Sequence, residues 1–287
     1  MKIKSTNFNI RQIAESGQCF RMKEREPGRY GLVAYGKYIE LRQMNEDTVE
    51  LGCNEGDYEG LWRYYFDIDF DYGRIVQVLS EGDDDFLRKA AEYGSGIRIL
   101  MQEPFEMLIS FIISQNKNIP SIKTCIERIC ERYGEQKVHE GSGTVYHAFP
   151  EPDMLAAAKK EELREMKLGY RDEYILRAAQ AVSSGEIDLS DLKKCSHEEA
   201  LKILKTIHGV GDKVASCVSL YGLHHIEAFP VDVWIKKVLN EVYHDKFSTG
   251  RFGGFTGIVQ QYMFYYKREL DSKKPKSIKP YKTQSAM

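Results

Sequence analysis

The sequence predicts an α+β protein, with an amino-terminal antiparallel β-sheet domain followed by a mainly α-helical domain. Short runs rich in β-branched and aromatic residues between residues 29 and 53 indicate strands. Beyond residue 60 the apolar residues change to helical spacing. A chain of 287 residues is also long enough for two domains, each with its own core.

The strand region consists of three segments, at residues 30–35, 38–41 and 48–51. Gly36 and Lys37 separate the first two segments, so we expect a hairpin turn there. The three segments together predict a small antiparallel sheet.

The helical region begins with apolar residues three and four positions apart in the segments 105–112 and 119–133. Further helices are expected at 172–184, 197–207, 212–221, 232–243 and 254–270, and the rest of this region is expected to be helical as well. We predict a sheet domain with a connecting helix over residues 1–95 and a helical domain over residues 96–272. Residues 273–287 are predicted to be a basic, flexible tail rather than a dedicated DNA-binding arm.

Composition narrows the possible classes of protein. No apolar run approaches the roughly 20 residues needed to span a bilayer, and the first residues lack the apolar core of a signal peptide. We therefore expect no membrane association, a cytoplasmic protein (associated with the nucleoid if prokaryotic) and six free cysteine thiols. No Cys/His spacing indicates a metal centre. The net charge of −2 does not by itself indicate nucleic-acid binding.

The segment 196–217 carries the strongest local signal. Ser196 and Glu199 have capping-box spacing, and the helix they begin has a predicted buried stripe that leads into the turn Gly209-Val210-Gly211 and a second helix. The members of that stripe are Ala200, Leu201, Ile203, Leu204 and Ile207. This is a helix-hairpin-helix, whose exposed N–H groups at the second helix start can bind one DNA phosphate. A glycine-containing hairpin packed inside an all-α domain explains the glycines equally well.

Lys213 favours the functional interpretation. A lysine in the first turn of a helix opposes the helix dipole, but that dipole and partial desolvation favour the neutral amine that can attack carbon. Cys217 lies one turn further on the same face. Without further context, a surface lysine and a small core cysteine remain the alternatives.

Asp232 follows 19 residues after Lys213, at a predicted helix N-cap behind Pro230. A capping aspartate is usually structural. Because backbone N–H groups would hold the carboxylate, we expect it to keep a low pKa and to stabilise positive charge on a sugar.

Several motifs in order resemble the helix-hairpin-helix glycosylase superfamily and, within it, the 8-oxoguanine DNA glycosylases. They span residues 7 to 270 and comprise Ser16-Gly17-Gln18-Cys19-Phe20-Arg21, the segment 111–119, Leu168-Gly169-Tyr170-Arg171, the hairpin with its lysine and aspartate, and Gln260-Gln261-Tyr262-Met263-Phe264.

The resemblance assigns the nucleophile to Lys213 and the catalytic carboxylate to Asp232. It places the flipped base between Cys217 and Phe264, with Gln260 on its Watson-Crick edge and the Gly17 carbonyl accepting the N7 hydrogen that guanine lacks. Asn116, Tyr170 and Arg171 would contact the opposite strand, with Asn116 filling the vacated space, Tyr170 wedging into the stack and Arg171 bonding the orphaned cytosine.

The chain departs from the animal and fungal pattern of that family at two positions. Ser121 stands where an arginine is expected, and Lys117 replaces an asparagine. We therefore expect relaxed selectivity for the base opposite the lesion.

The function expected from the sequence is that of a bifunctional DNA glycosylase and abasic-site lyase in base excision repair. It would excise 8-oxoguanine from double-stranded DNA through a lysine Schiff base, without cofactor, metal or obligate protein partner. A glycosylase for alkylated bases and a non-catalytic DNA-binding module are the alternatives. Lys213 disfavours the first, and covalent trapping would distinguish the second.

Overall fold

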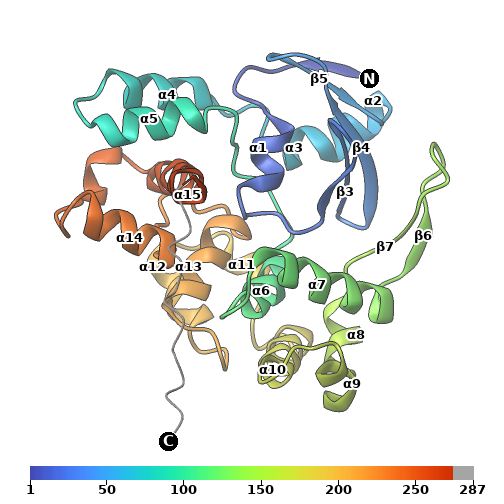
Figure 1. Cartoon of the computed structure of the whole chain (residues 1–287). Coiled ribbons are helices and arrows are strands. Elements are labelled where there is room, and N and C mark those ends of the chain that lie inside the picture. The colour runs from blue at the N-terminus through green and yellow to red at the C-terminus, as the bar shows by residue number, and fades with distance from the viewer. Residues whose placement is uncertain (274–287) are drawn as a thin grey trace, which may run out of the picture.

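The computed structural model describes residues 1–273. Its amino-terminal part is a five-stranded antiparallel sheet in the order β1-β5-β4-β3-β2 (Figure 1). The strands are β1 (Lys2–Lys4), β2 (Met22–Glu26), β3 (Arg29–Ala34), β4 (Lys37–Gln43) and β5 (Thr48–Leu51). The three predicted strands are thus confirmed, whereas the two edge strands β1 and β2 were not predicted.

The turn between β3 and β4 lies one residue earlier than predicted. Ala34 pairs with Lys37, so the two turn residues are Tyr35 and Gly36, with φ of 51° and 65°. A two-residue turn with positive φ at both positions matches the twist of the strands it joins. Lys37 already belongs to β4, and the predicted Gly36-Lys37 turn is wrong.

Helices make up most of the remaining chain. Those of the first half are α1 (Ile10–Glu15), α2 (Glu55–Asp57), the π-helical η1 (Tyr58–Trp62), α3 (Arg63–Tyr65), α4 (Tyr72–Glu81), α5 (Asp85–Tyr93), α6 (Pro104–Ile113) and α7 (Ile119–Tyr133). Those of the second half are α8 (Pro152–Ala156), α9 (Lys160–Glu165), α10 (Arg171–Ser183), α11 (Leu189–Leu192), α12 (His197–Leu204), α13 (Asp212–Tyr221), α14 (Val233–Glu241), the 3₁₀ turn η2 (Thr249–Phe252) and α15 (Thr256–Ser272).

The expectation that this region would be helical throughout is wrong in one place. A two-stranded hairpin of β6 (Gln136–Val138) and β7 (Val145–His147) follows α7. In Figure 1 it extends beside the main sheet. The sequence signal for these two strands is weak because Val138 and Val145 are exposed, so their apolar residues do not form a buried face.

Two hydrophobic clusters form the core. One lies between the main sheet and α1, η1 and α3, and includes Trp62, Tyr65 and Phe66. The other lies among the helices and is centred on α6, whose residues 106–113 are all buried. Helices α4 and α5 belong to this second cluster and lie over α15 (Figure 1), where the rings of Tyr93 and Tyr265 stack.

The capping box at Ser196 is confirmed, and Ala200, Leu204 and Ile207 of the predicted stripe are buried. Ile203 is 39% exposed, so including it in the stripe was wrong. It lies one residue before the buried Leu204, on the face of α12 that turns away from the core.

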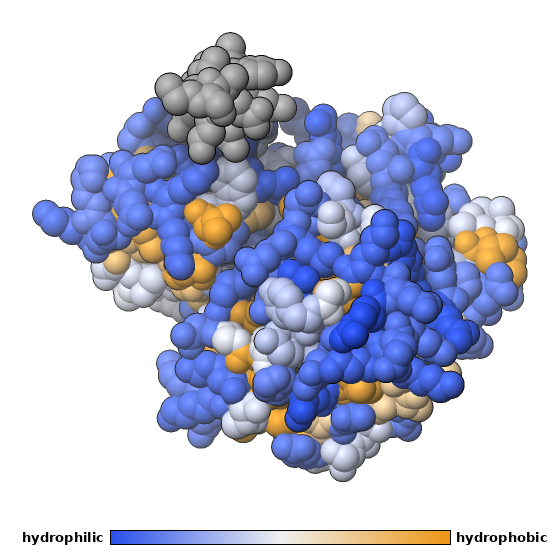
Figure 2. Space-filling view, turned by 60° about the horizontal axis from the view of Figure 1, so that its bottom comes forward, coloured by the Kyte–Doolittle hydropathy of each residue, from blue (hydrophilic) through white to orange (hydrophobic). Residues whose placement is uncertain are grey.

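The surface is mostly hydrophilic. Figure 2 shows polar residues over most of one face, with hydrophobic residues in separate patches. Within residues 1–273 no helix is long and apolar enough to cross a membrane. The predicted basic tail, apart from Lys273, lies outside the described residues.

Candidate active site

A cavity of about 740 Å³ lies where α13, α15 and the starts of α7 and α14 meet the loop after α1. It is lined by seven of the residues expected from the sequence to contact substrate: Gly17, Asn116, Lys213, Cys217, Asp232, Gln260 and Phe264. Segments more than 240 residues apart thus build one site. The sequence alone did not show that they share a cavity.

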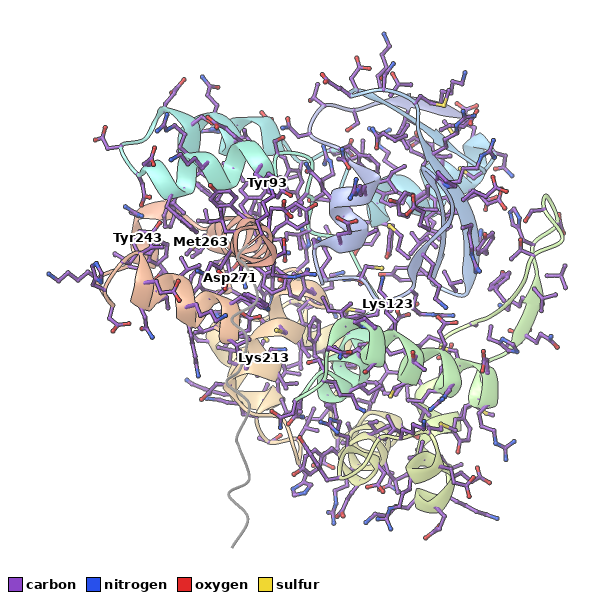
Figure 3. All side chains as sticks on the ribbon, viewed as in Figure 1. Tyr93, Lys123, Lys213, Tyr243, Met263 and Asp271 are labelled. Atoms are coloured by element: carbon purple, nitrogen blue, oxygen red, sulfur yellow. The ribbon has the colours of Figure 1, made fainter. Side chains whose placement is uncertain are left out.

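Lys213 occupies the first turn of α13, beside the end of α6 (Figure 3). Its Nζ donates a hydrogen bond of 3.0 Å to Ser114 Oγ, and Ser114 in turn donates to the Phe111 carbonyl at 2.7 Å. The Nζ also lies 5.1 Å from the centre of the Phe111 ring. The amine is therefore held at the cavity by a polar and an aromatic contact.

Asp232 is the N-cap of α14, as predicted. Its Oδ1 accepts hydrogen bonds from the backbone N–H groups of Trp234 and Ile235, at 3.0 and 2.9 Å. Both of these bonds go to Oδ1, so within residues 1–273 the cap leaves Oδ2 for the cavity that Asp232 lines.

The expected low pKa of Asp232 is wrong. Burial raises the pKa of this carboxyl, and the backbone donors and the positive charges of Lys213 and Arg268 oppose the shift without cancelling it. The cap bonds thus hold the carboxylate in place, while burial removes part of its hydration.

Cys217 and Phe264 line the part of the cavity assigned to the base. Burial raises the pKa of the Cys217 thiol, against the opposing charge of Lys213, so the thiol is a neutral surface for a planar base. The Phe264 ring lies against Gly17, whose φ is +80°, and Arg268 covers the ring at 5.3 Å from its centre.

Gln260 lines the same cavity but is only 3% exposed. Its Nε2 donates to the Pro230 carbonyl at 3.0 Å, and its Oε1 lies 3.3 Å from the Tyr221 hydroxyl. The amide is therefore part of a buried network as well as of the cavity wall.

The hairpin turn has the expected form, but its three residues differ in environment. Gly209 has φ of +88°, and a Cβ there would lie 2.2 Å from the Tyr174 ring, so this glycine allows close packing inside the protein. Val210 is buried and donates its N–H to Ile207. Gly211 is the N-cap of α13, is exposed and has no side-chain capping bond, so the start of α13 is open to an anion.

The residues expected at the opposite strand lie together beside the cavity. Asn116 Nδ2 donates to Tyr170 Oη at 3.1 Å, and Tyr170 is 49% exposed. Arg171 is only 6% exposed, and its guanidinium donates to the carbonyls of Gln115 and Leu168. In this structure it connects two loops, and its bond to an orphaned cytosine stays a prediction.

Charge at the cavity differs from the charge of the whole chain. Among the residues that the structure describes, four cationic ones line it, namely Lys117, Lys213, Lys236 and Arg268, against one acidic residue, Asp232. This local excess suits the phosphates of a nucleic acid despite a net charge of −2.

Sequence reasoning gave no role to Ser114, Tyr221, Trp234 and Arg268, which line the cavity, or to Gln261, which bonds to Tyr221 behind it. Tyr221 could have been found, because it follows Lys213 and Cys217 at four-residue steps along one face of α13. Ser114 and Arg268 gave no such signal, since their contacts depend on how α6 and α15 pack.

No metal site accompanies these residues in the described part of the chain, where no cluster of three His, Cys, Asp or Glu side chains is arranged for an ion. All six cysteines carry free thiols.

Comparison with known proteins gives two consecutive family matches. Residues 1–108 match the model of the 8-oxoguanine DNA glycosylase N-terminal domain, and residues 109–249 match the HhH-GPD superfamily of base excision DNA repair proteins.

Individual proteins are similar over most of the chain. The N-glycosylase/DNA lyase of Saccharomyces cerevisiae is 36% identical over 274 residues, which cover 85% of this chain and 70% of the yeast protein. The probable N-glycosylase/DNA lyase of Methanothermobacter thermautotrophicus is 30% identical, covering 71% and 73%. The 8-oxoguanine glycosylase/lyase of Clostridium acetobutylicum, solved with duplex DNA containing cytosine opposite 8-oxoguanine, is similar in structure with a TM-score of 0.87 and 36% identity, covering 94% and 98%.

Proposed function

Because the chain belongs to the 8-oxoguanine DNA glycosylase branch of the HhH-GPD superfamily, we propose that it excises 8-oxoguanine from double-stranded DNA and cleaves the strand at the abasic site. One observation carries this proposal most directly. The Lys213 amine and the Asp232 carboxylate line one cavity together with four residues suited to hold a flipped base.

The first step is extrusion of the damaged nucleotide, which costs a few kcal/mol of unstacking. The phosphate beside it binds the open start of α13 at Gly211, and the base enters between Cys217 and Phe264. The Gly17 carbonyl accepts the N7 hydrogen of 8-oxoguanine. Guanine has an acceptor at N7, so two acceptors would face each other and the undamaged base is rejected.

The chemical step uses Lys213 as the nucleophile. Once Lys213 has given one proton to solvent, its amine forms a bond from Nζ to C1′ as the bond from C1′ to N9 breaks, and the base leaves with the electron pair. The new ammonium then gives one proton to the departing base, and O4′ takes a proton from solvent when the ring opens. Opening of the sugar ring gives a Schiff base, and removal of a C2′ proton expels the 3′ phosphate. Water then releases the lysine.

Asp232 supports this step electrostatically. Its Oδ1 is fixed by the helix cap, so the carboxylate can stabilise the positive charge that develops on the sugar without moving. The reaction as proposed needs only side chains of the chain. The protein would act where the DNA lies, in the cytoplasm and at the nucleoid if the source is prokaryotic.

The opposite strand would be held less selectively than in relatives with two arginines facing cytosine. The hydrogen bond between Asn116, which lines the cavity, and Tyr170 supports a shared role of these two residues on that strand. Ser121, in the first turn of α7, is too short to replace the second arginine.

Borohydride trapping on duplex DNA containing 8-oxoguanine tests the proposal. The wild-type protein should give a covalent adduct and Lys213→Gln should give none while still binding the damaged duplex, because the substitution removes the amine and keeps the pocket. Lys236→Gln is the matched control: it also removes one positive charge from the cavity but keeps the proposed nucleophile, so it should still give the adduct when the DNA is saturated with protein. An adduct at wild-type yield in Lys213→Gln would overturn the choice of nucleophile. Binding without any adduct in the wild type would favour a non-catalytic DNA-binding module.

A further inference from the structure

Three buried side chains form a hydrogen-bond network at the wall of the cavity. Tyr221 comes from α13, and Gln260 and Gln261 are adjacent on α15. Their exposed fractions are 5%, 3% and 0%. The Tyr221 hydroxyl donates to Gln261 Oε1 and lies 3.3 Å from Gln260 Oε1. Neither Tyr221 nor Gln261 has a role in the chemistry proposed above.

Backbone carbonyls determine how both amides are oriented. The Pro230 carbonyl faces one end of the Gln260 amide at 3.0 Å, and the Ser16 carbonyl faces one end of the Gln261 amide at 2.6 Å. A carbonyl only accepts hydrogen bonds, so each of these ends must be the NH₂ group. Both amide oxygens therefore point toward the Tyr221 hydroxyl.

The hydroxyl has one proton for these two oxygens. This proton is shared between them, since the hydroxyl donates to Gln261 Oε1 and also, over 3.3 Å, to Gln260 Oε1. An amide oxygen has two lone pairs, so Gln260 Oε1 keeps one for a ligand. The order of donor and acceptor that Gln260 presents to the cavity is thus fixed by two contacts, the Pro230 carbonyl and the Tyr221 hydroxyl.

A fixed order of donor and acceptor on the Gln260 amide distinguishes guanine from adenine. The Watson-Crick edge of guanine presents an acceptor at O6 followed by a donor at N1, and that of adenine presents a donor at N6 followed by an acceptor at N1. An amide that can rotate by 180° could pair with either edge. A fixed amide complements one edge and opposes the other with like groups.

We propose that Tyr221 is a positioning residue that fixes the Gln260 amide, so that the cavity accepts 8-oxopurines with a guanine edge and rejects those with an adenine edge. This rests on the proposed function. Gln261 extends the same network to the Ser16 carbonyl, next to Gly17. The two contacts that recognise the base, one on the N7 side and one on the Watson-Crick side, are therefore connected through Tyr221.

The discriminating probe is 8-oxoadenine. Like 8-oxoguanine it has a hydrogen on N7 and an oxygen on C8, so the Gly17 carbonyl cannot tell the two apart. They differ on the Watson-Crick edge, which faces Gln260. Single-turnover excision of both bases from the same duplex measures what the Gln260 amide contributes.

Tyr221→Phe removes the hydroxyl and keeps the ring, which stacks on Phe111. We expect excision of 8-oxoguanine to fall roughly tenfold, the size of one hydrogen bond, and its preference over 8-oxoadenine to narrow by at least as much. Cleavage of a preformed abasic site, which has no base to recognise, should stay at the wild-type rate.

Tyr262→Phe is the matched control. Tyr262 is an equally buried tyrosine on α15, and its hydroxyl has no hydrogen-bond partner within residues 1–273. This variant should behave as the wild type in all three assays.

Each contrary outcome has a distinct meaning. An unchanged preference in Tyr221→Phe, or an equal loss of excision and abasic-site cleavage, would overturn the positioning role. Failure of the wild type to excise 8-oxoguanine would instead overturn the proposed function.

Discussion

Gly17→Ala would test whether the backbone at Gly17 recognises the lesion. The substitution adds one methyl group at a residue with φ of +80°. The new Cβ would lie 3.1 Å from Cε1 and 3.3 Å from Cζ of Phe264, and 3.6 Å from Cδ1 of Ile119. Alanine therefore meets both an unfavourable backbone conformation and the ring that is proposed to cover the base.

The two effects differ in size and in consequence. Left-handed backbone costs an L-residue about 1–2 kcal/mol, or roughly a factor of 5 to 30 in the folded population. The contact with Phe264 is milder, since the ring is the end of a flexible side chain and needs to move by a few tenths of an ångström. Either response displaces a group next to the base: rotation of residue 17 turns its carbonyl away, and movement of Phe264 narrows the space beside Cys217.

Gly28→Ala is a control that separates the backbone strain of an alanine at positive φ from an effect on base recognition. Gly28 has φ of +74°, lies in the turn between β2 and β3 and has nothing within 4 Å of an added Cβ. Both variants should lose about 1–2 kcal/mol of unfolding free energy in denaturant titrations. Only Gly17→Ala should also slow single-turnover excision of 8-oxoguanine, by at least tenfold, with abasic-site cleavage preserved. If the two variants excise 8-oxoguanine equally well, recognition of the N7 hydrogen does not depend on Gly17.

Two further predictions concern Asp232 and Ser121. Because burial raises the pKa of Asp232, its ionisation opposes folding. This penalty is absent below the pKa of an unfolded aspartate, grows between that pKa and the raised one, and is constant above the raised one. Asp232→Asn, which keeps a capping side chain, should therefore slow excision severalfold or more at neutral pH without lowering Tm, and should abolish the loss of excision that the wild type shows as pH falls through that pKa. An unchanged rate in this variant would remove the electrostatic role. Ser121→Arg should increase the preference for cytosine opposite the lesion by roughly ten- to hundredfold, from about 1–3 kcal/mol for a bidentate contact, in excision assays against all four bases at one salt concentration. A wild type already restricted to cytosine, or no change in the variant, would show that the missing arginine does not set this preference.

The sequence was sufficient where function depends on local geometry. The capping box at Ser196, the turn at Gly209-Val210-Gly211 and the N-cap at Asp232 each lie within a few residues of the groups that define them, and the structure contains all three. Local geometry gave the positions of Lys213 in a first turn and Asp232 at a cap, whereas their catalytic roles came from the family resemblance and stay predictions.

The sequence was insufficient for features that depend on packing between segments far apart in the chain. β1 and β2 are sheet edges, recognisable only from pairing with β5 and β3. The pKa of Asp232 depended on how deeply α13 and α15 bury the start of α14, which no local pattern contains. The hydrogen-bond network of Tyr221, Gln260 and Gln261 depends on how α13 and α15 pack, so the sequence gave no sign that these three residues contact one another.

The hydrogen bond from Gln261 to the Ser16 carbonyl joins residues 245 positions apart, and this has a consequence for the order in which the enzyme forms during synthesis. The hairpin and the nucleophilic amine leave the ribosome before α15, and the loop that holds Gly17 has long been made by then. A nascent chain that lacks α15 has the lysine but neither Gln260 nor Phe264, and cannot select a base. On the proposed mechanism, the site can therefore select a base only once α15 has packed against the loop after α1, although the proposed nucleophile is made earlier.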